Sequence, residues 1–471
     1  MVAVALSVTA CAAAEPIPDP EESTDHVTAP SPLEGLKAPE IVTERAWEWE
    51  APEGTVVHSV RPIPAGVAVF VTDGVVALRG DTGEELWRYR RTGEPTSDAN
   101  VTQGEESVAV SYEAGEGSSP DAMSHDIVLL DSLTGEITSE QNTDFTSLNS
   151  VPENISLLDP LPARLGLLTR DARVALGYGE DEQLAVRVFS LSRGEEVWSR
   201  TDIFEPNERG QEFRPGELAV SEDTLIVTGS FVDPVDRLSD LDHVQQHTAV
   251  IVALDAGGGG ELWRVEHELN APVTDRDINL STYPGSGTIA AVMEGSGYFE
   301  QWFLDPRTGK SVAEDVFAPG DHGIASIHEN GYITVETDSA SGTETYSLLD
   351  LSGDPVESVT VEETGVRAPE NFLLPMEAGV ARLDVGATSE GWEPARVQVF
   401  DWQTAGESLV IDLGIDVHRD PRSEEGSRSR FSVQPPTDMT LAPGALVITE
   451  VTKETILGNS ATESRRLVGL T

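Results

Sequence analysis

The sequence predicts an all-β protein, an eight-bladed β-propeller, and three observations support this fold class. The phrase at residues 77–87, ALRGDTGEELW, returns in variant form along most of the chain. Its copies follow one another at intervals of roughly 50 residues, which is the length of one propeller blade built from short strands. The two ends of the chain also look like complementary parts of one blade. We therefore expect a ring of similar sheets.

The repeated phrase describes a hairpin. A strand ends in apolar residues, a tight turn carries Thr-Gly, and a second strand begins with Glu-Leu-Trp. A close copy occupies residues 253–263 (ALDAGGGGELW), and weaker copies lie at residues 130–137, 189–198, 304–310, 349–353 and 400–407. The equivalent turn positions lie 44 to 65 residues apart and are Gly83, Gly135, Gly194, Gly259, Gly309, Gly353 and Ala405.

Each residue type in the phrase has a structural reason. Glycine suits the left-handed backbone that a short hairpin loop requires. The tryptophan that follows can lie flat between adjacent blades, where a large ring buries much apolar area. We expect this packing role for Trp87, Trp198 and Trp263. Trp302 and Trp402 flank expected strand ends, and we expect them to pack in the blades as well.

The phrase A-L-D-x-x-T-G-x-x-x-W resembles the repeat of the pyrroloquinoline-quinone (PQQ)-like β-propeller family over roughly residues 40–471. That family includes quinoprotein dehydrogenases and, without any cofactor, the lipoprotein of the outer-membrane β-barrel assembly machine. The resemblance implies the blade architecture. Activity does not follow from it, because function depends on sites built on a fold.

The chain ends predict how the ring closes. Residues 45–50 (RAWEWE) look like an outer strand without a preceding partner, and residues 466–470 (RLVGL) look like a strand that lacks its outer mate. Pairing Trp47–Glu50 with Leu467–Leu470 would close the ring and leave neither strand as an exposed edge. This count gives eight blades. A seven-bladed ring with a degenerate terminal unit is the alternative.

The composition is strongly acidic. The 83 Asp and Glu residues outweigh 30 Lys and Arg, so the net charge is -53. Such a surface repels nucleic acid and anionic lipid headgroups, and we expect no nucleic-acid partner and a monomer. Adaptation to salt and an ordinary acidic extracytoplasmic surface are both compatible with this balance.

The single cysteine, Cys11, follows an apolar run in the context VTAC. This resembles a bacterial lipobox, so residues 1–11 are expected to be a truncated lipoprotein signal peptide with lipidation at Cys11. A signal peptide begins with basic residues, and residues 1–10 contain none, which indicates a start codon further upstream. Lipidation predicts an extracytoplasmic protein anchored to a membrane by its acyl chains.

The remaining chain divides into a tether and the propeller. Residues 12–40 are acidic and rich in Pro, and they are expected to form a disordered tether. Residues 41–471 are expected to form the propeller. Its long connections, such as residues 416–437 with four arginines, would lie on the faces of the ring, where binding surfaces are usually built.

Signatures of catalysis are weak. His243 and His247 lie four apart near Asp236, Asp240 and Asp242, but a strand is expected to begin beside His247, which disfavours a helical zinc site. The chain lacks a nucleophile elbow, a Walker loop and the HExxH motif. We therefore expect no catalytic residues, no metal site and no cofactor.

The leading hypothesis is a lipid-anchored module that binds or scaffolds a protein partner in the cell envelope. The alternatives are a PQQ-dependent oxidoreductase and a receptor for a small ligand or glycan.

Overall fold

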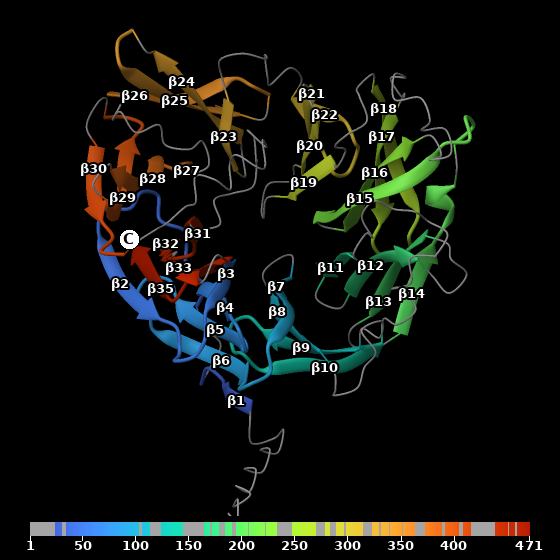
Figure 1. Ribbon diagram of the computed structural model, residues 1–471, viewed down its shortest axis with the longest axis horizontal. Helices are drawn as coiled ribbons and strands as arrows, with labels where there is room; N and C mark the ends of the chain where they lie inside the picture. Colours follow the sequence, from blue (N-terminus) through green and yellow to red (C-terminus); the bar gives the residue numbers. More distant parts are fainter. Residues whose placement is uncertain are drawn as a thin grey trace, which may run out of the picture.

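The computed structural model describes the chain in segments. These are residues 24–30, 34–102, 106–113, 124–144, 164–169, 172–178, 184–190, 195–205, 207–221, 223–232, 247–269, 278–282, 289–295, 298–313, 323–328, 331–338, 340–350, 352–362, 373–388, 391–404, 408–415, 439–450, 452–456 and 459–471. Within them, the strands form eight sheets of four or five strands and one separate two-stranded hairpin. The sheets follow one another around a ring in chain order (Figure 1), so the chain is an all-β β-propeller, as predicted.

The first half of the ring consists of four sheets. Sheet 1 contains β1 (Thr24–Val27), β3 (Val57–Ile63), β4 (Gly66–Val71), β5 (Gly74–Arg79) and β6 (Glu85–Arg91). Sheet 2 contains β7 (Thr96–Val101), β8 (Ser107–Glu113), β9 (Ser124–Asp131) and β10 (Ile137–Asp144). Sheet 3 contains β11 (Arg164–Thr169), β12 (Ala172–Tyr178), β13 (Leu184–Ser190) and β14 (Glu195–Arg200). Sheet 4 contains β15 (Glu212–Ser221), β16 (Thr224–Val232), β17 (His247–Asp255) and β18 (Glu261–Leu269). A short 3-10 helix, Asp202–Phe204, links sheets 3 and 4.

The second half completes the ring. Sheet 5 contains β19 (Ile278–Thr282), β20 (Ile289–Gly295), β21 (Tyr298–Leu304) and β22 (Ser311–Ala313). Sheet 6 contains β23 (Gly323–His328), β24 (Gly331–Asp338), β25 (Thr343–Asp350) and β26 (Pro355–Glu362). Sheet 7 contains β27 (Leu373–Met376), β28 (Gly379–Thr388), β29 (Gly391–Asp401) and β30 (Ser408–Asp412). The closing sheet contains β31 (Met439–Ala442), β32 (Ala445–Thr449), β35 (Arg466–Leu470) and β2 (Arg45–Glu50).

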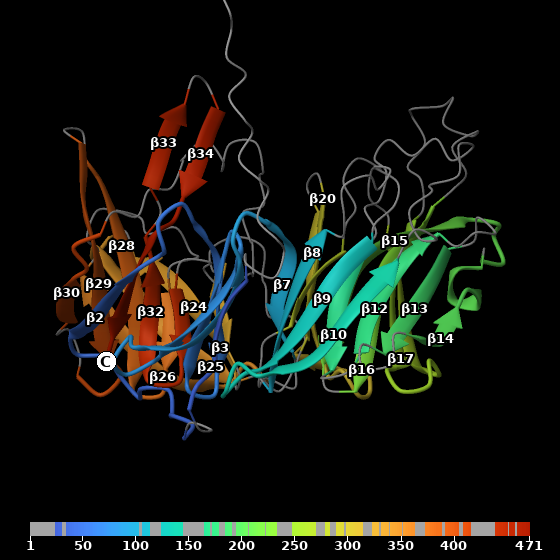
Figure 2. The ribbon, with the colours of Figure 1, turned by 90° about the horizontal axis from the view of Figure 1, so that it is seen from below.

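The two faces of the ring can be told apart because the strands of each sheet are joined as an antiparallel meander. The turn from the first to the second strand and the turn from the third to the fourth strand lie at the same end, which we call the turn face. The hairpin of β33 (Thr452–Ile456) and β34 (Asn459–Glu463) is inserted between β32 and β35, at the opposite end. Figure 2 shows this hairpin standing out beyond the ends of the neighbouring strands.

The repeated tryptophan packs between sheets, as the sequence predicts. Trp87 of β6 is fully buried, and its indole N–H donates to the carbonyl of Ser132 in sheet 2 at 3.0 Å. The ring lies on the turn glycine of that sheet. A methyl group added to Gly135 would come within 2.7 Å of the indole, and the φ of this glycine is +69°, in the left-handed region. Glycine is therefore required here for two reasons: its backbone φ is positive, and the indole ring of Trp87 leaves no room for a side chain.

The same contact recurs at three further interfaces. The pairs of tryptophan and turn glycine are Trp47 with Gly83, Trp198 with Gly259, and Trp263 with Gly309. In each pair the indole N–H donates to a turn carbonyl of the next sheet, at 2.7 to 2.8 Å. The predicted packing role of Trp87, Trp198 and Trp263 is thus confirmed. Trp402 is also buried, in the core between sheets 6 and 7.

The predicted pairing of the chain ends is confirmed. β2 runs antiparallel to β35, with Trp47 opposite Gly469 and Glu50 opposite Arg466. β35 in turn pairs with β32, so one sheet contains strands from both ends of the chain. Because backbone groups of both ends satisfy each other, neither β2 nor β35 is left without a neighbour on this side.

The segment expected to be a disordered tether, residues 12–40, is ordered in the parts that the structure describes. Residues 12–23 lie outside the described residues. Residues 24–27 form β1, which pairs with β6, and residues 34–44 lie against the turn face. The acidic, proline-rich composition predicted disorder, but the segment does not need a core of its own because it binds backbone groups and apolar surface of the finished ring.

We expect the indole of Trp47 to be a major part of ring closure. Replacing Trp47 with Ala should lower the free energy of unfolding by about 3–5 kcal/mol, the usual cost of removing a buried tryptophan. Trp47→Phe keeps a ring over Gly83 but loses the hydrogen bond to the carbonyl of Gly80, so it should cost clearly less. Urea unfolding of both variants measures this. Equal losses for Phe and Ala would contradict a stacking role.

Candidate interaction surface

The outer edges of the sheets form the perimeter of the ring, which we call the rim. All seven large apolar side chains that are exposed in the described residues lie on outermost strands: Val27, Ile137, Val197, Leu262, Val356, Leu409 and Val410. An outermost strand also presents unpaired backbone groups that can pair with another strand. The rim therefore combines apolar contacts with backbone hydrogen-bonding capacity.

One rim edge is already occupied. β1 adds to the outer edge of β6 as the fifth strand of sheet 1, antiparallel, with Thr24 opposite Arg91 and Val27 opposite Arg88. Figure 1 shows β1 beside β6 at the perimeter. This is an intramolecular example of strand addition to a sheet edge, a common mode of peptide recognition.

Side chains fix the register of β1. The carboxylate of Asp25 accepts a hydrogen bond from Nε of Arg88 at 2.7 Å, and this bond holds the pKa of Asp25 below its usual value. The ring of His26 meets the ring of Tyr89 edge to face at 5.4 Å, and its Nε2 lies 2.8 Å from the carbonyl oxygen of Gly135. β1 therefore contacts sheet 2 as well as sheet 1.

Residues on the C-terminal side of β1 contact the turn face. The N–H of Ala29 donates to the carbonyl of Thr134 in sheet 2. We call residues 34–44 the strap. Its Leu36 N–H donates to Pro64 of sheet 1, and its carbonyls at Lys37 and Glu40 accept from the closing sheet and from sheet 7. β1 and the strap together thus contact four consecutive sheets, which are sheet 2, sheet 1, the closing sheet and sheet 7.

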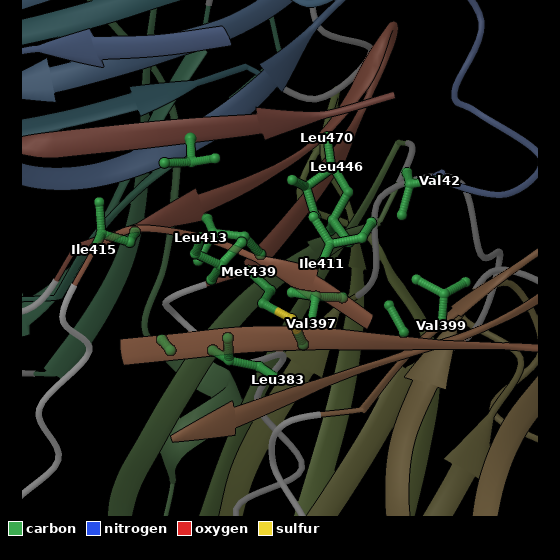
Figure 3. Close-up of a cluster of buried hydrophobic side chains, with 14 of the residues drawn as sticks. Val42, Leu383, Val397, Val399, Ile411, Leu413, Ile415, Met439, Leu446 and Leu470 are labelled. Carbon is green, nitrogen blue, oxygen red and sulfur yellow. The ribbon is translucent and has the colours of Figure 1, made fainter. Parts of the chain in front are cut away.

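The strap also contributes to the core. Val42 has 0% exposure and lies in the apolar cluster between sheet 7 and the closing sheet. Figure 3 shows Val42 beside Leu470 and Leu446 of the closing sheet, with Val397 and Val399 of sheet 7 in the same cluster. Burying a valine contributes about 1.5–3 kcal/mol, which favours an ordered strap.

A buried polar cluster joins sheets 6 and 7. The side chain of Arg382 on β28 is 0% exposed, and it donates to the Tyr346 hydroxyl at 2.6 Å and to Glu344 at 3.2 Å, both on β25. It also donates to Asp384 and Gln398 within sheet 7, at 2.8 Å each. Burial raises the pKa of Asp384, and the nearby Arg382 charge opposes this without reversing it.

A second cluster joins sheets 1 and 2. The guanidinium of Arg91 lies over the ring of Tyr112 at 4.5 Å and donates to Asp126 at 3.3 Å and Glu140 at 2.9 Å. Burial raises the pKa of Tyr112, so its phenol stays protonated and donates to the carbonyl of Asp73. In both clusters the arginine donates to groups of the neighbouring sheet, an arrangement that holds sheets together.

Most residues singled out from the sequence for chemistry fall outside the described part of the chain. These are Cys11, Asp236, Asp240, Asp242, His243 and the basic stretch at 416–437. His247 is the first residue of β17, which agrees with the expected strand. Among the described residues, no group of three or more His, Cys, Asp or Glu side chains is placed to hold a metal ion. The described residues contain no helix with the length and apolarity to cross a membrane.

Sequence reasoning missed β1, the strap and both arginine clusters. The one sequence signal for β1 is the short run Thr24–Val27, which contains two β-branched residues inside an acidic context. Arg382 and its partner Glu344 are separated by 38 residues, and no spacing rule links residues of neighbouring blades.

Comparisons with known proteins give distant similarity to solved structures alone. No family model and no curated protein matches the chain. Among solved structures, the β-propeller domain of the Trilobed protease from Pyrococcus furiosus is similar at 10% identity and a TM-score of 0.38, with 75% of this chain and 97% of that chain covered. A prolyl endopeptidase gives 11% identity and 0.40, with 87% and 54% covered. Dihydro-heme d1 dehydrogenase NirN gives 11% and 0.37, with 96% and 81% covered. Likeness at this level carries no argument about activity.

The buried Arg382 cluster predicts a large stability effect. Arg382→Ala should lower the free energy of unfolding by about 3–5 kcal/mol, because it leaves the carboxylate of Glu344 buried without its cation. Arg466→Ala removes an exposed pair with Glu48 in the closing sheet and should cost less than about 1 kcal/mol. Denaturant unfolding compares the two variants. Similar losses would show that the cluster does not stabilise the contact between sheets 6 and 7.

The stability contributed by the docking of β1 should depend on pH. The hydrogen bond from Arg88 lowers the folded-state pKa of Asp25, so the pair contributes fully above the usual pKa of an aspartate and is lost as pH falls through the lowered value. Native protein should therefore exceed Asp25→Asn in unfolding free energy by up to about 1 kcal/mol at pH 7. The difference should become smaller as pH falls below the usual aspartate range. Urea unfolding between pH 3 and 7 measures it, and a difference independent of pH would contradict the assignment.

Proposed function

We propose that the chain is an eight-bladed β-propeller lipoprotein that is anchored to a membrane through Cys11 and serves as a binding or scaffolding module for a protein partner in the cell envelope. Each of the eight sheets would be one blade. The tryptophan and glycine contacts at four interfaces support membership in the PQQ-like repeat family, on the branch that includes the barrel-assembly lipoprotein.

The observation that carries the proposal is the addition of β1 to the outer edge of β6. It is an example within the molecule of a rim edge pairing with an extended segment that is not part of the blade. The apolar side chains exposed on the other outermost strands offer similar contacts to a partner. The described residues bring together no metal cluster, and both arginine clusters are engaged in holding sheets together.

The position of β1 also bears on the anchor. Thr24 is bound to the rim of sheet 1, so only residues 12–23 separate Cys11 from the ring. An extended chain of this length reaches about 45 Å at most. The proposed lipid anchor would therefore hold the propeller, which we expect to be a monomer, close to the membrane.

The anchor is tested by mass spectrometry of the protein extracted from envelope membranes with detergent. We expect the acyl modification on Cys11 as the first residue of the mature chain. Cys11→Ser should shift the protein from the membrane fraction to the soluble fraction without changing its thermal unfolding midpoint. Recovery of an unmodified Cys11 thiol in membrane-bound protein would contradict the anchor.

A further inference from the structure

The fourth strand of the blade in sheet 1 and the fourth strand of sheet 4 begin with the same four residues. β6 begins with Glu85-Leu86-Trp87-Arg88, and β18 begins with Glu261-Leu262-Trp263-Arg264. The match is structural as well as sequential, because Trp87 and Trp263 both donate to a turn carbonyl of the next sheet and both stack on its turn glycine. β18 is therefore the counterpart of β6 on sheet 4.

The two edges differ in what covers them. On β6, Leu86 is half-buried in the cluster that also contains Ala29, and Arg88 binds Glu85 of its own strand as well as Asp25 of β1. On β18, Leu262 is 50% exposed, and no described strand pairs with the outer edge. Arg264 binds Glu261 of its own strand at 3.0 Å, as Arg88 binds Glu85. Arg264 also lies 3.9 Å from Glu266 of the same strand, and among the described residues no carboxylate of another strand contacts it as Asp25 contacts Arg88.

We propose that the outer edge of β18 is a docking site for an extended segment of a protein partner, which adds to sheet 4 in the antiparallel register that β1 adopts on β6. This inference rests on the proposed binding function and names its surface. The chain's own Thr24–Val27 is held on β6 by the Arg88 pair and the His26 contact, so the occupant comes from another protein.

The charges on β18 define the chemistry of the occupant. In the register of β1, Asp25 lies opposite Arg90 and Val27 lies opposite Arg88. The equivalent positions on β18 are Glu266 and Arg264. Opposite charges that face each other across strands are favourable and like charges are unfavourable. The site therefore selects a segment with a basic residue opposite Glu266 and an acidic residue two positions later, opposite Arg264.

The middle residue of this segment would face Val265, just as His26 faces Tyr89. Its side chain can be small or apolar, because the counterpart pair on sheet 1 is a ring contact with no ion pair. Backbone pairing would supply the affinity, and the two charges would set direction and register.

Disulfide trapping tests the site, because Cys11 is the one natural thiol. The full chain with Cys11→Ala and Val265→Cys is equilibrated in a glutathione buffer with the peptide Ser-Thr-Arg-Cys-Glu-Thr-Ala. A charge-swapped peptide, Ser-Thr-Glu-Cys-Arg-Thr-Ala, is the matched control. We expect the first peptide to form the mixed disulfide at least about fivefold more favourably, since two cross-strand charge pairs reverse sign between the peptides.

Two protein variants sharpen the result. Adding Arg264→Glu and Glu266→Arg should reverse the preference between the peptides. Val410→Cys on the outer edge of β30, in the Cys11→Ala background, should show no preference, because that strand lacks the motif. Fluorescence anisotropy of the labelled peptide with the otherwise native chain, at high peptide excess, gives an independent measure if Val265→Cys perturbs folding.

Equal trapping of both peptides at Val265→Cys, with no difference in anisotropy, would overturn the docking site. That result would leave the lipid anchor intact, because anchoring is read from the mass of Cys11. Conversely, an unmodified Cys11 with a clear preference for the first peptide would remove the anchor and keep the docking site.

Discussion

The ring is closed within one sheet, by a single antiparallel pair of strands. β2 and β35 come from opposite ends of the chain and lie side by side through the hydrogen bonds of one ladder. Every other sheet relies on neighbours on both sides for the burial of its faces. The pairing therefore supports the core of the entire ring. The strap also stabilises the closure, since it contacts the closing sheet, sheet 1 and sheet 7 on the turn face.

Two kinds of contact hold adjacent sheets together. Near the turn face, an indole lies on a glycine of the next sheet, and its N–H finds a carbonyl there. Further from that face, the buried Arg382 and the partly buried Arg91 donate to carboxylates and hydroxyls of the adjacent sheet. Buried arginines require such partners because an unpaired charge in the core is costly. Together these contacts give each sheet a defined orientation.

This construction leaves the rim as the part of the molecule with unused bonding capacity. The outermost strand of each sheet has one edge inside the sheet and one edge outside it. In sheet 1 the outside edge is filled by β1, and in sheet 4 the same four-residue motif carries an exposed leucine. A protein with these features can hold a partner by adding one strand, without any change in the ring itself. The proposed lipid anchor would place that rim near a membrane.

The all-β class, the turn glycines, the packing of Trp87 and the pairing of residue 47 with the last strand could all be predicted from the sequence. These features depend on local turn geometry and on a repeat, which one chain segment displays by itself. The strap, β1 and the Arg382 cluster could not be predicted in this way. Val42 and Asp25 are ordered by surfaces that exist only after distant sheets have assembled. The folded ring determines which residues these side chains contact. Contacts between segments far apart in the chain depend on burial and complementary charge, and they produce no periodic pattern in the sequence of either segment.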